Sequence, residues 1–279
     1  MVDPFKGKIA LITGGSSGIG LAAARALAAR GSHVWIMARD QGRLEKAAHL
    51  VRCDCQSDEQ KCGIIAADVS NLKEVLQAVD YLREKIGVPD LLINSAGVVR
   101  PGYIQDLKFE HFRWMMEINY LGTVYPTKAV LPDMIERGSG HIVNISSPVG
   151  CVGVFGYSAY GASKFAVCGF SDALRVEVKP LGIKVSLVIP PDTDTPQLAY
   201  EHQYKPPELK VITDNMKTFT AESVSNTMLR GISKNRYLIL IGADTKFIVH
   251  ASSLIGSNVY PIVDAIYSIS RKLVKGKGY

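Results

Sequence analysis

Short apolar runs alternate with longer amphipathic segments along most of this sequence, and this alternation limits the folds that the chain can adopt. The apolar runs are rich in β-branched residues and several are apolar throughout, as expected of strands buried on both faces. Alternating strands and helices predict a parallel sheet covered by helices on both faces. The strands are expected at residues 8–13, 33–38, 63–68, 90–94, 141–146, 184–189 and 237–241.

The segments between these strands repeat their apolar residues at helical spacing. Two stretches lack a periodic pattern. Residues 53–61 are polar and predict a surface insertion, and residues 190–207 predict a long loop of the kind that often covers a substrate. Helices are expected at residues 19–30, 44–51, 72–86, 112–136, 163–178 and 221–232.

The first strand leads directly into a glycine-rich loop, TGGSSGIG at residues 13–20, which a helix follows. Glycines let the backbone turn tightly and approach a pyrophosphate, whose charge sits at the helix N-terminus. The G-x-x-x-G-x-G spacing differs from the common dinucleotide fingerprint, so the strand and helix around it carry the prediction. The alternative is a βα turn without a ligand. The expected cofactor contacts of the loop are Gly14, Ser16, Ser17, Gly18, Ile19 and Gly20.

The end of the second strand indicates which dinucleotide the chain prefers. An acidic residue there would accept from a ribose hydroxyl, but this strand ends in Ala38-Arg39. The guanidinium of Arg39, with Arg43 four residues later, suits a 2′-phosphate, which predicts NADPH/NADP+ rather than NAD(H). The alternative is a solvated Arg39 with Asp40 facing the ribose. Asp68, with Val69 beside it, is expected at the adenine, although Asp68 also suits a plain turn.

Three further residues predict acid–base chemistry. Tyr160 and Lys164 are four residues apart, so on a helix they lie on one face. A neighbouring ammonium favours the phenolate and lowers the pKa of the tyrosine, which makes it a usable general acid. Ser147 ends the fifth strand, where its hydroxyl is placed to donate to a developing alkoxide.

These pieces, taken in order, resemble the classical short-chain dehydrogenase/reductase family. The matching segments are TGGSSGIG (13–20), NSAG (94–97), INYLG around Asn119, Ser147 and YGASK (160–164), and they span residues 7–200. The resemblance implies a Rossmann-type doubly wound sheet of about seven strands and a ketone reductase. It implies that Tyr160 donates the proton, Lys164 lowers its pKa and holds the nicotinamide ribose, Ser147 orients the carbonyl and Asn119 holds a water in a proton relay. Further cofactor contacts are expected at Asn94, Ala96, Gly97, Tyr160, Lys164, Pro190 and Thr193.

Two positions depart from the family pattern. Ser95 replaces the second asparagine of the usual NNAG, which is a tolerable change. Pro191 replaces the glycine that usually follows Pro190, and proline lacks the positive φ that glycine permits. The turn after the sixth strand is therefore expected to differ locally.

Within the family, the segments INYLGTVYPTKAVLPDM and IPPDTDTPQLAYE are similar to 3-ketodihydrosphingosine reductases, the NADPH enzymes of sphingoid base synthesis. This likeness predicts reduction of the lipid-like ketone 3-ketodihydrosphingosine. Another ketone, such as a 3-oxoacyl thioester or a steroid, is an alternative substrate. A catalytically idle NADP(H)-binding module is the alternative from a different class of function.

The last part of the chain predicts a separate amphipathic tail. We expect the reductase domain over residues 1–243, with a substrate loop at about 190–220, and the tail over residues 244–279. Apolar residues recur at helical spacing from Val259 and basic residues follow, which suits a membrane surface. The same stripe is more often core or a subunit interface, and we also expect a homo-oligomer, a dimer or tetramer.

Net charge, cysteine spacing and hydropathy limit the kinds of partner and the location that the sequence predicts. The net charge of +6 is spread along the sequence rather than gathered in a basic stripe, so nucleic acid is not predicted. The five cysteines lack paired CxxC spacing, so we expect reduced thiols and no metal site. The opening MVDPFKGK has no apolar core and no stretch is a convincing membrane span, which predicts a cytoplasmic protein, with or without peripheral membrane contact.

Overall fold

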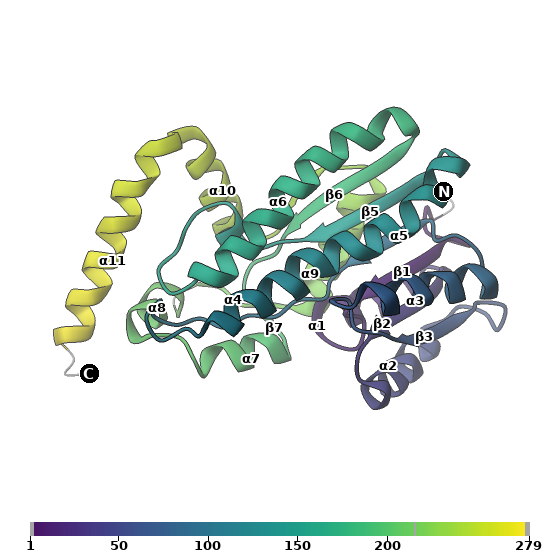
Figure 1. The fold of residues 1–279 in the computed structure, drawn as a ribbon, viewed down its shortest axis with the longest axis horizontal. Helices are drawn as coiled ribbons and strands as arrows, with labels where there is room; N and C mark the ends of the chain where they lie inside the picture. Colours follow the sequence, from purple (N-terminus) through teal and green to yellow (C-terminus); the bar gives the residue numbers. More distant parts are fainter. Residues whose placement is uncertain (1–2, 215, 277–279) are drawn as a thin grey trace.

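Seven parallel strands form one central sheet in the spatial order β3-β2-β1-β4-β5-β6-β9 (Figure 1). The computed structural model describes residues 3–214 and 216–276, so residues 1–2 and 215 of the expected domain and 277–279 of the expected tail lie outside it. All seven strands lie where the sequence predicts one, and the predicted doubly wound α/β fold is confirmed. They are β1 (Ile9–Thr13), β2 (His33–Ala38), β3 (Cys62–Ala66), β4 (Leu91–Asn94), β5 (Gly140–Ile145), β6 (Ile183–Ile189) and β9 (Leu238–Leu240).

The strand order reverses beside β1, which pairs with β2 on one side and with β4 on the other. At such a reversal the connections leave the sheet toward opposite faces and open a crevice at the carboxyl ends of the strands. The glycine-rich loop follows β1, so it lies at this crevice.

Helices cover both faces of the sheet because neighbouring strand residues point in opposite directions. Ile12 and Ile36 pack with one helical layer, and Leu11 and Met37 pack with the other. The first layer comprises α1 (Gly18–Ala28), α2 (Gln41–Cys53) and α9 (Ala221–Ser233), and the second comprises α3 (Leu72–Lys85), α5 (Gly122–Arg137) and α6 (Ser158–Val178). The helix expected at 112–136 is divided into α4 (Phe109–Met115), a π-helical turn (Met116–Leu121) and α5.

The segment after β6 is more ordered than the sequence predicts. It contains β7 (Thr193–Asp194), which pairs with β8 (Phe219–Thr220), and two short helices, α7 (Pro196–His202) and α8 (Pro207–Thr213). The expected loop at 190–207 is therefore wrong over α7. The helix begins there because the Thr195 hydroxyl accepts from the Leu198 backbone N–H and Pro196 occupies the first turn.

The tail forms two helices, α10 (Ala243–Ile255) and α11 (Val259–Gly276), joined by a 3₁₀ turn (Gly256–Asn258). Figure 1 shows α11 standing away from the sheet, and it packs against α8. The rings of Phe155 and Tyr267 stack with centroids 4.4 Å apart and add a second contact. Among the described helices, none has the length and apolar character needed to cross a membrane.

Candidate active site

A cavity of about 800 Å³ opens at the carboxyl ends of the strands. The glycine-rich loop after β1 lines one end of it, and α10 and α11 line the other. Parallel α/β sheets bind their ligands at this edge. One continuous cavity therefore joins the predicted phosphate site to an apolar compartment.

The glycine-rich loop comes close to the neighbouring backbone, and this proximity explains its glycines. Gly14 has φ +66°, and a Cβ on it would stand 2.7 Å from the Ala96 backbone. Gly18 has φ +53°, another conformation that favours glycine. A Cβ on Gly20 would meet the Gly14 carbonyl oxygen at 2.5 Å, so Gly20 supports the loop from beneath rather than facing the cavity. The loop thus leaves an open cradle at the N-terminus of α1, and this cradle fits a pyrophosphate.

Two arginines border the same end of the cavity. The side chains of Arg39 and Arg43 are 59% and 71% exposed. The Arg39 guanidinium lies 3.8 Å from Asp68. Asp40 caps α2 by accepting from the Arg43 backbone N–H at 2.8 Å, so its carboxylate already has a structural role. Two arginines at this end of the cavity suit the binding of a 2′-phosphate. Asp68 lines the cavity and also holds its own turn, by accepting from Ser70.

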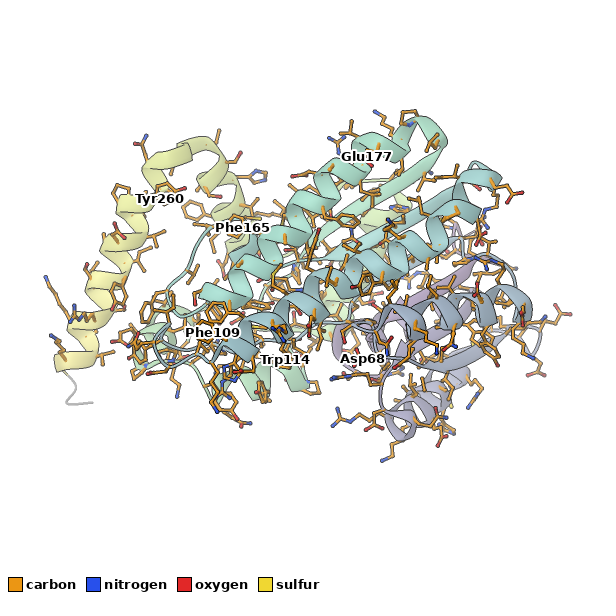
Figure 2. All side chains as sticks on the ribbon, viewed as in Figure 1. Asp68, Phe109, Trp114, Phe165, Glu177 and Tyr260 are labelled. Atoms are coloured by element: carbon orange, nitrogen blue, oxygen red, sulfur yellow. The ribbon has the colours of Figure 1, made fainter. Side chains whose placement is uncertain are left out.

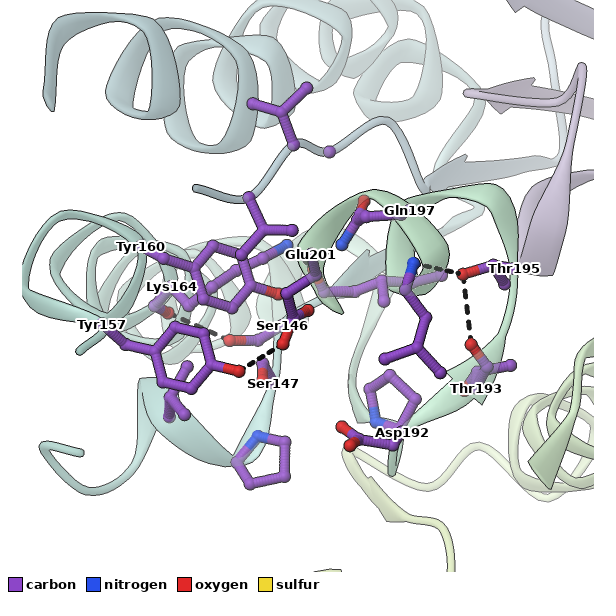
Figure 3. A pocket seen from close by; sticks show the side chains of 18 of the residues that line it. Ser146, Ser147, Tyr157, Tyr160, Lys164, Asp192, Thr193, Thr195, Gln197 and Glu201 are labelled. Carbon is purple, nitrogen blue, oxygen red and sulfur yellow. Dashed lines mark hydrogen bonds between the residues drawn. The ribbon is translucent and has the colours of Figure 1, made fainter. Parts of the chain in front are cut away.

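Tyr160, Lys164 and Ser147 meet in one wall of the cavity, at the end of β5 and the start of α6 (Figure 3). Tyr160 and Lys164 are both buried. The Lys164 ammonium donates to the Ile145 carbonyl at 3.0 Å and lies 5.8 Å from the centroid of the Tyr160 ring. The three side chains that the sequence links through spacing are therefore brought together.

The electrostatics of this wall differ in part from expectation. Burial lowers the pKa of Lys164 to about 8. Burial and the nearby Glu201 carboxylate raise the pKa of Tyr160, while hydrogen bonding to Ser147 and Gln197 lowers it. The predicted fall in the Tyr160 pKa is thus wrong for this structure. The physical reason is that desolvation penalises the phenolate and the lysine is turned toward Ile145.

Asn119 and Asn94 lie behind the cavity rather than in its lining. The Asn119 amide donates to the Val98 carbonyl at 2.9 Å and to the Ser163 hydroxyl at 2.8 Å, and its oxygen accepts from the Val98 N–H. Asn94 is buried and donates to Thr127 and Asn144. Both residues join neighbouring elements. The other predicted residues line the cavity, namely Ser16, Ser17, Ile19, Val69, Ala96, Gly97, Pro190 and Thr193.

The departures from the family pattern are accommodated locally. Pro190 and Pro191 follow β6 and line the cavity, and the Thr193 hydroxyl donates to the Pro191 carbonyl at 2.8 Å. Ser95 also lines the cavity, and its backbone N–H donates to Thr13.

Sequence reasoning missed two parts of the cavity wall. The first comprises Asp192, Gln197 and Glu201, at and around α7. The Thr195-Pro196 pair is a helix-start signal that would have found this helix. The second is the inner face of the tail, whose helical spacing is visible in the sequence but whose contact with the cavity is not. It contributes Ile248, Ile255, Val259, Ile262, Val263 and Ile266.

Known proteins resemble this chain in sequence and in fold. The family model described as short chain dehydrogenase matches residues 8–205. The 3-dehydrosphinganine reductase of Danio rerio is 38% identical over 86% of this chain and 73% of that protein. The 3-ketodihydrosphingosine reductase of Bos taurus is 38% identical over 84% of this chain and 71% of its own length. A short-chain dehydrogenase from Sphingobium yanoikuyae, solved in complex with NADPH, superimposes with a TM-score of 0.76 at 26% identity, over 91% of this chain and 96% of that one.

Proposed function

Since this chain belongs to the short chain dehydrogenase family, we propose that it uses NADPH to reduce a ketone to a secondary alcohol, with 3-ketodihydrosphingosine as the substrate. The observation that carries the proposal is the position of Tyr160, Ser147 and Lys164. They lie in one wall of a cavity that connects a phosphate cradle to an apolar compartment.

Residues along the crevice at the carboxyl ends of the strands would hold NADPH. The cradle formed by Gly14 and Gly18 would take the pyrophosphate, and Arg39 and Arg43 would take the 2′-phosphate. Lys164 is placed to hold the nicotinamide ribose. The cofactor, when bound, supplies the hydride that reaches the carbonyl carbon.

Side chains of the protein bind and protonate the carbonyl oxygen of the substrate. The Ser147 hydroxyl donates to the carbonyl oxygen and orients it, and this hydrogen bond strengthens as negative charge develops. The Tyr160 hydroxyl then transfers its proton to that oxygen, which completes the alcohol. The raised pKa of Tyr160 keeps its hydroxyl protonated before the transfer, and the hydrogen bonds to Ser147 and Gln197, which lower that pKa, favour the release of the proton. Asn119 positions Val98 and Ser163 around this centre.

The choice of substrate rests on the cavity wall and on the relatives. The compartment beyond Tyr160 is lined by apolar residues of α10 and α11, which suit a long hydrocarbon chain. The two relatives reported above are named for activity on a long-chain sphingoid ketone. A 3-oxoacyl thioester, a steroid or an idle NADP(H)-binding module are the competing assignments.

Steady-state NADPH oxidation with 3-ketodihydrosphingosine tests the proposal, with NADH, a 3-oxoacyl thioester and a steroid ketone measured in parallel. We expect the sphingoid ketone and NADPH to give a kcat/KM at least about tenfold above every other pair. A thioester or steroid that is reduced faster would replace the substrate assignment. NADPH binding without reduction of any ketone would favour the idle module.

We also propose that the protein is cytoplasmic and meets its lipid substrate at a membrane surface, through the outer face of the tail. Leu254 is 87% exposed, Tyr260 is 66% exposed and Ile269 is 59% exposed. Figure 2 shows Tyr260 on the tail. None of the three lines the cavity. Arg271, Lys272 and Lys275 add positive charge beside them, which suits anionic lipid.

Co-sedimentation with anionic liposomes tests the membrane contact. Deleting residues 257–279, or combining Leu254→Ser with Ile269→Ser, should lower the bound fraction severalfold. If both variants bind liposomes as well as the wild type does, the membrane contact is contradicted.

The exposed residues Phe165 and Val176 on α6 support the further proposal of a homo-oligomer, which sedimentation velocity of the full chain would test.

A further inference from the structure

A buried group of charged side chains lies in the cavity wall beside Tyr160, and the reduction chemistry gives it no role. The Lys205 ammonium lies 3.1 Å from Glu201 and 3.9 Å from Asp192. The Lys205 side chain is fully buried and also donates to the Thr213 hydroxyl at 3.2 Å. Burying charged groups costs desolvation free energy unless they are paired, so a group of this kind beside the reacting tyrosine suggests a functional role.

The charges in this group do not cancel. Two carboxylates face one ammonium, which leaves an excess of one negative charge. Tyr157 stays neutral, because burial and Glu201 raise the pKa of its phenol, and its hydroxyl donates to Glu201 (Figure 3).

The carboxylates, rather than the lysine, face the ligand. Asp192 and Glu201 line the cavity, whereas Lys205 does not and lies behind them. Asp192 is the more accessible of the two, with 32% of its side chain exposed. The unbalanced negative charge is therefore presented to whatever occupies the cavity.

The charged group of Asp192, Glu201 and Lys205 lies close to Tyr160, where the substrate carbonyl would react. The rings of Tyr157 and Tyr160 are 5.7 Å apart, and the hydroxyl of Tyr157 reaches Glu201. Negative charge at this point works against any build-up of phenolate on Tyr160 after the proton has moved. A cation held between the carboxylates and the tyrosine would offset that effect. The site thus suits a substrate that brings a positive charge close to its ketone.

We propose that Asp192 and Glu201 form a subsite for an ammonium group on the carbon next to the substrate carbonyl. This inference rests on the proposed reductase function and assigns the residues that recognise the amino group of the long-chain ketone proposed above. Such a substrate places its ammonium one carbon away from the carbon that receives the hydride, so the ammonium must bind within the same wall as Tyr160 and Ser147. Carboxylates are the partners that an ammonium donates to most strongly.

The test compares two ketones of equal chain length, 3-ketodihydrosphingosine and its 2-deamino analogue, each with NADPH. We expect the wild-type protein to prefer the amino ketone by at least about tenfold in kcat/KM, since a neutral analogue leaves the carboxylate unpaired. Asp192→Asn should lower that preference at least about tenfold. Asp106→Asn, which changes an exposed aspartate outside the cavity lining, serves as the matched control and should keep the wild-type preference.

A second variant guards against misfolding. Glu201→Gln alone removes the closer carboxylate from the buried Lys205, so the double variant Glu201→Gln/Lys205→Met removes both charges together. Because this variant keeps Asp192 and the excess negative charge, it should keep part of the preference for the amino ketone, and adding Asp192→Asn to it should remove the rest. If wild type reduces both ketones equally, or if Asp192→Asn and the triple variant keep the wild-type preference, the ammonium subsite is wrong while the reductase function stands. If wild type reduces neither ketone, the proposed function itself fails.

Discussion

Tyr160 has a buried hydroxyl in a wall that contains Ser147, Lys164 and Glu201. Replacing it with Phe removes the hydroxyl that we propose as the proton donor but keeps the ring that packs beside Tyr157. We expect Tyr160→Phe to lower kcat at least about a hundredfold, within the range for loss of a general acid. The measurement is steady-state ketone reduction, with NADPH affinity from fluorescence titration as the control. Normal turnover by this variant would contradict the mechanism.

We propose that Arg39 gives the chain its preference for NADPH over NADH. It borders the same end of the cavity as the glycine-rich loop with a largely exposed guanidinium, and Asp68 is its ion-pair partner in the structure. A hydrogen bond between charged groups contributes about 1.5–3 kcal/mol, so Arg39→Ala should raise the KM for NADPH about tenfold or more. The KM for NADH, which has no 2′-phosphate, should change little. Parallel kinetics with the two cofactors measure the difference, and an equal rise for both would show that Arg39 does not recognise the phosphate.

At the scale of the elements, β5 and β6 share a buried histidine that makes stability depend on pH. His141 pairs with the Ser186 hydroxyl at 2.8 Å, and burial lowers its pKa from 6.5 to about 4. The unfolded chain therefore takes up a proton before the folded chain does. The contribution of His141 to the free energy of unfolding is fully present above pH 6.5. It is lost as the pH falls toward 4, by about 3 kcal/mol in total.

Urea unfolding at pH 7 and pH 4.5 measures this loss. His141→Gln keeps a hydrogen-bonding side chain without a titrating ring, so its stability should fall less over the same pH interval. The wild type and the variant each lose free energy of unfolding between pH 7 and pH 4.5. The difference between these two losses separates the effect of His141 from that of the carboxylates that also titrate. An identical loss for the variant and the wild type would contradict the role of His141.

Helix α7 shows why one element was missed. Its seven residues are too few for the apolar repeat that identified the longer helices. The helix is specified instead by its start, where the Thr195 hydroxyl caps the Leu198 N–H and Pro196 fits the first turn. Glu201 lies on this helix, so its place in the cavity wall was missed together with the helix.

At the scale of the whole molecule, α11 and the sheet domain line one cavity, and we expect them together to limit the length of ligand that it accepts. Val263 is half-buried on the inner face of α11. Val263→Trp should fill the apolar compartment and lower kcat/KM for a long-chain ketone at least about tenfold, since each excluded CH₂ costs about 0.8 kcal/mol. A short ketone that ends before α11 should lose far less.

A series of ketones with increasing chain length measures this effect. Leu76→Trp is the control for a tryptophan on the surface, because Leu76 is 45% exposed on α3 and lies outside the cavity lining. Equal losses on short and long ketones would show that the Trp disturbs the fold rather than the chain-binding compartment.

Local patterns in the sequence determined the sheet, the cradle and the reacting trio. Strand and helix periodicity follow from burial, the glycines follow from backbone proximity and positive φ, and Tyr160 and Lys164 share a helix face because they are four residues apart. The tertiary structure alone decided how distant segments meet. Residues 192–205 bring an unbalanced negative charge to Tyr160, and the tail lines the apolar end of the cavity. Such contacts depend on the packing of elements far apart in the chain, which no local spacing encodes.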